Sequence, residues 1–166
     1  TSLLQQLAEH EQSTPGESFD YHNVVYSLIE NVIESSAQKP FPEALDTLLF
    51  QPLGMRNVIV GDIDFANQDN HAWPHTKDKK KKLQASKSYS RFYHQSVASA
   101  GGISANIEAM AKFLQLHLGA RPDILSREDL SDFHSPTVAA PDAQMRLTKY
   151  IDGQFKSHYG LGWRIV

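Results

Sequence analysis

The stretch from Pro15 to Asn23, Pro-Gly-Glu-Ser-Phe-Asp-Tyr-His-Asn, constrains the fold more than any other, because a turn signal leads directly into a long apolar segment. Apolar residues then recur at helical spacing in two adjacent rows: Val24, Leu28 and Val32, and Val25, Ile29 and Ile33. We predict a helix from Val24 to about Ala37 that buries this stripe and cannot pass Pro40. Asn23 is well placed to be its N-cap.

Composition limits the possible classes of protein. A chain of 166 residues with 40% hydrophobic and 21% charged residues is long enough for one folded domain with a sizeable core. The absence of cysteine excludes disulfides, cysteine catalysis and thiolate metal sites, and it suits an oxidising compartment. The net charge of -3 predicts no affinity for nucleic acid or for an anionic membrane.

The ends and the hydropathy of the chain give two further expectations. No stretch approaches the roughly 20 apolar residues of a membrane span, and no signal peptide is visible. The chain starts at Thr1 in the middle of a helical pattern, so we expect it to be a segment of a longer protein.

Further helices are predicted from spacing and from end signals. One covers residues 2 to about 11, and another starts near Pro42 and ends at Gly54. A third has Asn106 as its cap and ends at Gly119, and a short fourth is capped by Ser126. The buried face of the third helix is predicted to contain Ile107, Met110, Ala111, Leu114 and Leu118.

Strands are predicted only at the edges of this helical pattern. Residues 55–60 form a candidate short strand, and the alternation over 159–166 favours a second. Residues 61 to about 97 are polar and irregular. Their lysine run, residues 77–82, predicts a solvated loop, with a binding patch as the alternative. His71 and His75 do not predict a metal site, because Pro74 prevents the helix that would place both on one face.

Four segments in a fixed order resemble one protein family. They are Pro-Gly-Glu-Ser-Phe-x-Tyr-x-Asn at 15–23, Phe-Pro-Glu-Ala-Leu at 41–45, Ala-Gly-Gly-Ile-Ser at 100–104 and Tyr-Gly-Leu-Gly-Trp at 159–163. This order is similar to the middle of the serine hydrolases that include class C β-lactamases, DD-peptidases and related esterases. In that family Tyr-x-Asn is the second of three active-site elements, after Ser-x-x-Lys and before Lys-Thr-Gly or His-x-Gly.

The resemblance implies roles for four residues. Tyr21 would relay a proton between a nucleophilic serine and the leaving group, and Asn23 would bind a substrate amide or orient the lysine. Ala100 and Gly101 would lie at the edge of the substrate cleft. A tyrosine serves as a base only where cations lower its pKa from about 10 or where a lysine shares the proton. The alternative for Tyr21 is an aromatic anchor ahead of a helix.

The nucleophile itself is not predicted within this sequence. Ser36-Ala-Gln-Lys39 matches Ser-x-x-Lys, but it follows Tyr-x-Asn and lies at the C-terminal end of a predicted helix, directly before Pro40. The family's serine lies at a helix start, where backbone N–H groups help to bind an oxyanion. We therefore interpret the Ser36 match as accidental. No third motif follows Trp163.

These observations predict a mainly α (α+β) fold, a single partial domain over 1–166 that corresponds to the helical lobe of a β-lactamase-like hydrolase. One or two short strands lie at its edges. From about residue 158 onward, the chain is expected to re-enter the central sheet. The resemblance implies hydrolysis of a β-lactam, D-Ala-D-Ala peptide or ester through an acyl-serine, without metal or cofactor. The isolated segment is expected to be inactive. The alternative is a non-catalytic homologue or a helical binding module.

The same resemblance gives expectations for partners and compartment. The partner would be a small-molecule or peptidoglycan-like substrate, and the location would be periplasmic or secreted. Self-association is expected to be possible, because a lobe separated from its partner exposes apolar surface.

Overall fold

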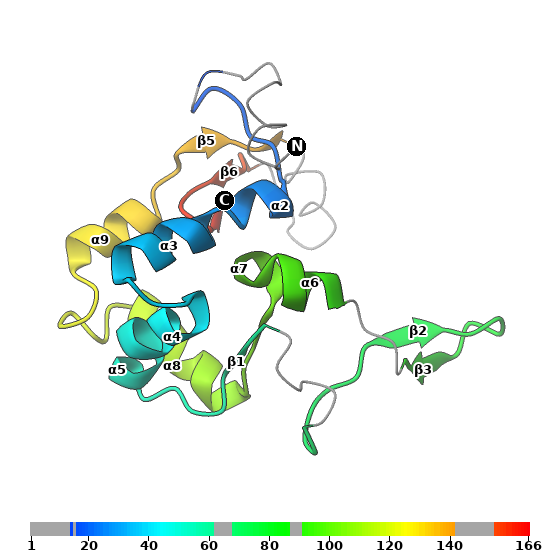
Figure 1. Ribbon diagram of the computed structural model, residues 1–166. Coiled ribbons are helices and arrows are strands. Elements are labelled where there is room, and N and C mark those ends of the chain that lie inside the picture. Colours follow the sequence, from blue (N-terminus) through cyan, green and yellow to red (C-terminus); the bar gives the residue numbers. More distant parts are fainter. Residues whose placement is uncertain (1–13, 15, 62–67, 87–90, 142–154) are drawn as a thin grey trace, which may run out of the picture. The chain divides into compact units, whose positions relative to one another are not determined.

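The computed structural model describes residues 14, 16–61, 68–86, 91–141 and 155–166, which group into two compact units (Figure 1). The first unit joins the chain up to Tyr21 with the residues from Arg121 onward, and the second is His22–Ala120. The helix predicted over residues 2–11 lies outside the described residues. No helix in the described ranges has both the length and the apolar composition to cross a bilayer.

The apolar segment after Tyr21 forms two helices instead of the predicted one, α2 (Asn23–Tyr26) and α3 (Ile29–Ala37). The predicted cap is wrong, because Asn23 is the first helical residue and His22 is the N-cap, with its Nδ1 accepting from the Val25 amide at 3.3 Å. The helix is interrupted at Ser27, whose hydroxyl donates to the Val24 carbonyl at 2.7 Å. Such a side-chain bond competes with the helical ladder.

The apolar stripe of these two helices is only partly covered. None of their residues is fully buried, and Val32 is exposed. The end of α3 is fixed by Gln38, whose φ of 54° is left-handed, and by Glu34, whose carboxylate accepts from the Phe41 amide at 2.8 Å. The next helix therefore begins at a defined point.

That next segment contributes four side chains to the core of the second unit. It runs through α4 (Phe41–Leu45), a π-helical turn η1 (Asp46–Phe50) and α5 (Gln51–Leu53), which confirms the helix predicted up to Gly54. Its buried side chains are Phe41, Ala44, Phe50 and Leu53. Gly54 ends it at a φ of 65°, a conformation that glycine adopts at little cost.

The helix α8 (Ile107–His117) has the predicted cap but a different buried face. Asn106 Oδ1 accepts from the Ala109 amide at 2.8 Å, as expected. The residues predicted to be buried are exposed, to 82% for Ile107 and 77% for Leu118, and likewise for Met110, Ala111 and Leu114. The buried residues are Ala109 and Leu116, in a row that also holds Lys112, which donates to the Gly54 carbonyl next to α5.

Two strand pairs complete the second unit. In the first, β1 (Ile59–Val60) pairs antiparallel with β4 (Ile103–Ser104), and the Gly61 amide donates to the Gly102 carbonyl at 2.9 Å. In the second, β2 (His75–Lys77) and β3 (Leu83–Ala85) form an antiparallel hairpin. This hairpin corrects the prediction of an irregular loop around the lysine run. The helices α6 (Arg91–Ser96) and α7 (Ala98–Gly101) follow.

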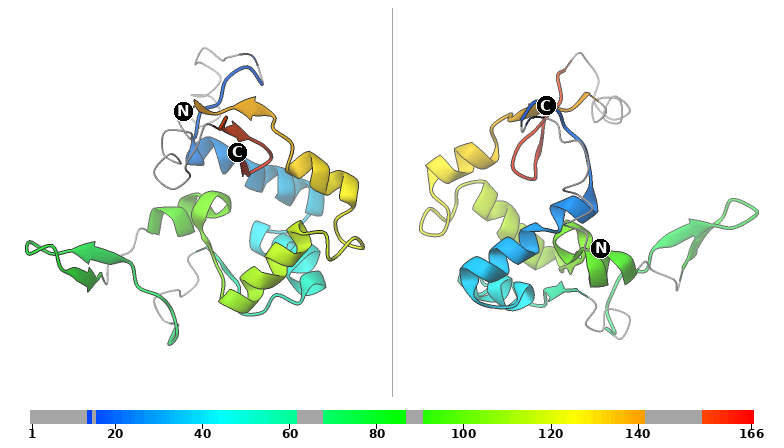
Figure 2. Two further views of the ribbon diagram at one scale, coloured as in Figure 1. Left: turned by 180° about the vertical axis from the view of Figure 1, so that it is seen from behind. Right: turned by 45° about the horizontal axis from the view of Figure 1, so that its top comes forward.

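The first unit contains α9 and a small sheet. α9 (Arg127–Phe133) has the predicted Ser126 cap, completed by Asp129 as a capping box. The sheet has the order β5 (Val138–Ala139), β6 (His158–Tyr159) and β7 (Arg164–Ile165), all antiparallel (Figure 2). Residues 159–166 therefore form a hairpin instead of one strand, and the described strands outnumber the one or two predicted.

Gly160 explains why the β6–β7 turn is close to α9. A Cβ at this position would lie 2.8 Å from the carbonyl oxygens of Phe133 and Ser135, closer than side chains normally approach. Only glycine fits there.

The single partial domain predicted over 1–166 stays a prediction.

Candidate active site

In the first unit, the aromatic loop before α2 is anchored by Phe19 and not by Tyr21. The Phe19 ring stacks on Tyr159 of β6, with centroids 4.4 Å apart and planes 23° apart. Tyr21 lies further out, 6.5 Å from the Phe19 ring, and its side chain is 55% exposed. An aromatic anchor buries its ring, so the anchoring role considered for Tyr21 belongs to Phe19.

In the second unit, two segments that are far apart in the sequence come together. α2, which begins with Asn23, packs against α7, which carries Ala100 and Gly101. Asn23 and Ala100 are half-buried, and Gly101 is exposed. The structure thus brings together the elements that hold three of the four predicted site residues. Tyr21 belongs to the other unit.

A carboxylate that the sequence did not single out fixes α7. Glu30 Oε1, on α3, accepts from both the backbone amide and the hydroxyl of Ser99, each at 2.8 Å. Hydrogen bonds to an ionised carboxylate are stronger than those between neutral groups. Glu30 therefore acts as a brace that holds the turn of α7 against α3. Glu30 is the one charged residue between Val24 and Ile33, and this was the available signal.

The turn is held on its other sides as well. Val97, the N-cap of α7, is almost fully buried. Gly102 directly follows α7, and its carbonyl accepts from the backbone amide of Gly61. Gly61 has a φ of 82°, and a Cβ there would lie 3.2 Å from the His94 carbonyl oxygen. The backbone of the predicted cleft edge is therefore tied at several points.

The Ser-x-x-Lys match of residues 36–39 lies at the end of α3. Ser36 is exposed in the last turn, two residues before the left-handed Gln38. The ammonium group of Lys39 donates to the hydroxyl of Thr47 at 3.2 Å. The helix start that would supply free backbone N–H groups is at the other end of α3.

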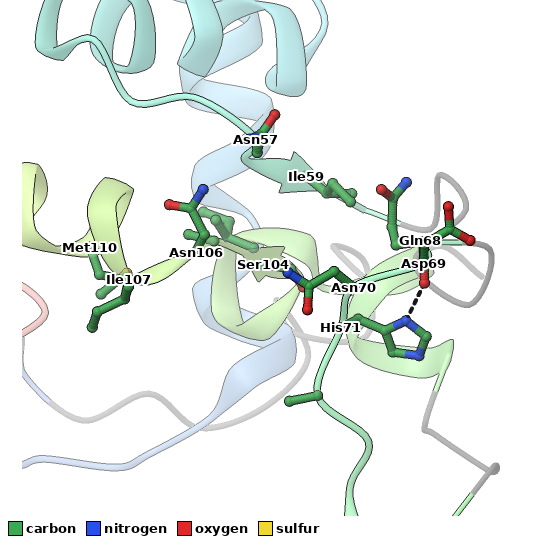
Figure 3. Close-up of a pocket in the computed structure, with 13 residues that line it drawn as sticks. Asn57, Ile59, Gln68, Asp69, Asn70, His71, Ser104, Asn106, Ile107 and Met110 are labelled. Atoms are coloured by element: carbon green, nitrogen blue, oxygen red, sulfur yellow. Dashed lines mark hydrogen bonds between the residues drawn. The ribbon is translucent and has the colours of Figure 1, made fainter.

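An open concavity of about 1070 Å³ also lies in the second unit, beside β1 and β4 (Figure 3). Its lining combines amides and apolar side chains with one carboxylate, and the ring Nδ1 of His71 donates to the Gln68 carbonyl at 2.5 Å. None of the four predicted site residues borders it. The lining residues are Asn57, Ile59, 68–72, 103–107 and Met110.

The described part of the chain contains no group of three or more histidine, cysteine, aspartate or glutamate residues placed to hold a metal ion. His71 is instead paired through its ring with Trp73, at a centroid distance of 4.2 Å.

Comparison with known proteins decides the family. The model of the family described as Beta-lactamase matches residues 1–166. The chain belongs to the beta-lactamase family. This membership agrees with the order of the four segments found in the sequence. No curated protein matches the chain.

Solved structures show the same fold over most of this beta-lactamase-family chain. The octameric penicillin-binding protein homologue from Pyrococcus abyssi has a TM-score of 0.72 at 20% identity, over 92% of this chain and 31% of that one. The D-stereospecific amidohydrolase from Streptomyces sp. has a TM-score of 0.66 at 20% identity, over 95% and 42%. The penicillin-binding protein from Bacillus halodurans has a TM-score of 0.62 at 21% identity, over 92% and 41%. The chain thus spans less than half of each of these proteins.

Proposed function

We propose that this chain is the helical part of a serine hydrolase that cleaves an amide, β-lactam or ester through an acyl-serine intermediate. In this proposal Tyr21 relays the proton, Asn23 contacts the substrate or orients a lysine, and Ala100 and Gly101 line the cleft edge. The nucleophilic serine, its lysine and the third motif are supplied by residues outside these 166. Acyl transfer requires such a nucleophile, a base and oxyanion donors.

The observation that carries this proposal is the packing of α2 against α7. A helix that begins with Asn23 and a turn that contains Ala100 and Gly101 are joined in one unit, and Glu30 fixes that turn through Ser99. The exposure of Tyr21 also supports the proposal, because a proton relay must reach its substrate. The position of Ser36 at the C-terminal end of α3, away from the free backbone N–H groups of a helix start, supports a nucleophile from elsewhere.

The substrate class to test first is an amide of a D-amino acid. A D-amino acid amidase from Ochrobactrum anthropi has a TM-score of 0.57 to this chain at 20% identity, and the Streptomyces structure is a D-stereospecific amidohydrolase. The fold hosts several chemistries, so β-lactams and esters belong in the same panel. A periplasmic or secreted location suits such substrates.

The test is covalent labelling of the full-length protein that contains this chain. A fluorescent penicillin should label it, and mass spectrometry should place the label on a serine outside the 166 residues. The isolated chain should take up no label and should turn over neither a D-alanyl amide nor a p-nitrophenyl ester. A label on Ser36 would contradict the assignment of the nucleophile. A folded full-length protein inert to all three substrate classes would favour the non-catalytic binding module.

We further propose that the exposed row of α8, which consists of Ile107, Met110, Leu114 and Leu118, supports self-association. Four apolar side chains on one helix face form a patch of the kind that marks an interface. The penicillin-binding protein homologue from Pyrococcus abyssi is octameric.

A further inference from the structure

The lysine run forms the tip of an ordered hairpin. The backbone amide of Asp78 donates to the Lys82 carbonyl at 2.9 Å, and the Lys81 amide donates to the Asp78 carbonyl at 2.9 Å. The Asp78 side chain closes the same turn, because its Oδ1 accepts from the amides of Lys80 and Lys82, both at 2.8 Å. The turn is therefore built around one aspartate, and the lysines occupy fixed places on it.

One of these lysines stands where glycine or asparagine is usual. Lys81 has a φ of 60°, which is in the left-handed region. A three-residue hairpin loop that ends in this conformation normally places glycine there. A non-glycine residue in a disfavoured backbone conformation is an outlier of the kind that points to a function. Here the outlier adds one more positive charge to the tip.

The two faces of the hairpin differ. On one face Gln84 donates to Asp78 Oδ2 at 2.8 Å, so this face is occupied by an internal polar contact. On the other face Lys77 pairs directly with Leu83, and cross-strand partners point to the same side. Leu83 is 69% exposed. The second face thus presents an apolar side chain beside the cationic Lys77, next to the tip that holds lysines 79–81.

The charge of the hairpin is opposite to that of the rest of the chain. Five lysines against one aspartate give residues 75–85 a charge of +4, which leaves −7 for the other residues of a chain whose net charge is -3. Within the described residues none of the five lysine ammonium groups forms an ion pair, and all five side chains are exposed. The net charge therefore conceals a local cationic patch.

We propose that the β2–β3 hairpin docks the protein on an anionic phospholipid surface, with Lys77 and the tip lysines 79–81 against the headgroups and Leu83 inserted between them. Lysines near an anionic bilayer each add to the binding, and one apolar side chain among them deepens it. A nucleic acid would be met by arginines and exposed aromatic side chains, and residues 75–85 contain neither. This docking is independent of the hydrolase proposal.

The test is co-sedimentation of the full chain with vesicles of phosphatidylcholine, with and without phosphatidylglycerol. The chain should bind only the anionic vesicles, and less so as salt rises from about 0.1 M to about 1 M. Changing Lys77, Lys79 and Lys80 to glutamine should lower the partition coefficient about a hundredfold, at about fivefold per lysine. Leu83→Gln should lower it roughly tenfold.

Matched controls separate the hairpin from net charge. Changing Arg127, Lys156 and Arg164 to glutamine removes the same charge from exposed positions elsewhere and should leave binding within about threefold. Thr76→Gln, on the opposite face of the hairpin, should also leave it unchanged. Circular dichroism should show every variant folded.

Three results would overturn the proposal: no binding to anionic vesicles at low salt, an equal loss in the control triple variant, or full vesicle binding by Leu83→Gln. A DNA duplex that competes the chain off the vesicles, and binds Leu83→Gln as well as the parent, would assign the patch to nucleic acid instead.

Discussion

At the scale of single residues, the exposed phenol of Tyr21 carries most of the chemistry proposed for this chain. Its neighbour Phe19 performs the packing, because the Phe19 ring stacks on Tyr159 while Tyr21 extends beyond it. In the proposed function, two aromatic residues in one loop thus divide anchoring and chemistry between them. That division makes the phenol oxygen separable from the fold.

We predict that Tyr21→Phe in the full-length protein slows acylation by about 10²–10⁴-fold, the usual contribution of a general acid–base group. The melting temperature should change little, because the ring and its contacts remain. Single-turnover acylation and thermal unfolding measure the two effects. Phe19→Ala is the matched comparison and should lower stability instead. Acylation at the parental rate in Tyr21→Phe would make this tyrosine a packing residue.

We predict that His22→Ala lowers the free energy of unfolding by about 0.5–1 kcal/mol, since it removes the acceptor for the Val25 amide at the start of α2. His22→Asn should keep most of that stability, because asparagine is a good N-cap. Urea unfolding of the three proteins checks this. An equal loss in both variants would show that the cap bond is not the cause.

At the scale of elements, the contact between α3 and α7 is what places the Gly-Gly turn. We predict that Glu30→Ala lowers the free energy of unfolding by about 1.5–3 kcal/mol, the range for hydrogen bonds to a charged group. Glu30→Gln, which keeps one acceptor oxygen, should lose less. In a double-mutant cycle with Ser99→Ala, the two side chains should show a coupling energy above about 0.5 kcal/mol. Strict additivity would mean that the hydroxyl contact contributes nothing.

The stability of the β2–β3 turn should depend on pH through the ionisation of Asp78. Hydrogen bonds from the Lys82 amide, the Gln84 side chain and the Lys80 amide hold the pKa of the Asp78 carboxyl below its ordinary 3.8. A lowered pKa means that the carboxylate stabilises the turn at pH above 3.8, and that this contribution is lost as pH falls below 3.8 through the folded pKa.

We therefore predict that the amide signals of Lys80 and Lys82 shift together, with a midpoint below pH 3.8, in an NMR titration from about pH 6 to about pH 2. In Asp78→Asn this titration should disappear. A midpoint at or above 3.8, or the same titration in the asparagine variant, would contradict the role of the carboxylate.

Elements whose signals are local could be predicted from the sequence. The caps Asn106 and Ser126 and the helical run that ends at Gly54 each depend on neighbouring residues, and the structure contains all three. The buried face of α8 could not be predicted, because the helix is apolar on two sides and only the contact with α5 selects one. The β2–β3 hairpin was missed because a run of lysines shows no alternation of apolar and polar residues. Its turn is closed by the Asp78 side chain and not by a typical turn sequence.

At the scale of the whole molecule, α8 leaves a continuous apolar row uncovered within the described residues. We predict that the chain self-associates at micromolar concentration, and that the double variant Leu114→Gln and Leu118→Gln shifts it toward the monomer. Leu48→Gln, at an exposed leucine on η1, is the control and should leave the assembly unchanged. Sedimentation velocity over a range of concentrations measures this. A monomeric parent, or an equal effect of the control, would contradict the role of the row.

The pairing of β1 with β4 has a consequence for how this family can diversify. It holds the two ends of the segment 61–102 together, and the hydrogen bond from the Gly61 amide to the Gly102 carbonyl adds to this pairing. When the ends of a segment are clamped, lengthening its outer part costs little, since the entropy of closing a loop grows only with the logarithm of its length. The hairpin can therefore change in length and sequence while α2, α7 and Glu30 stay in place. The proposed docking surface and the proposed active site can then evolve separately.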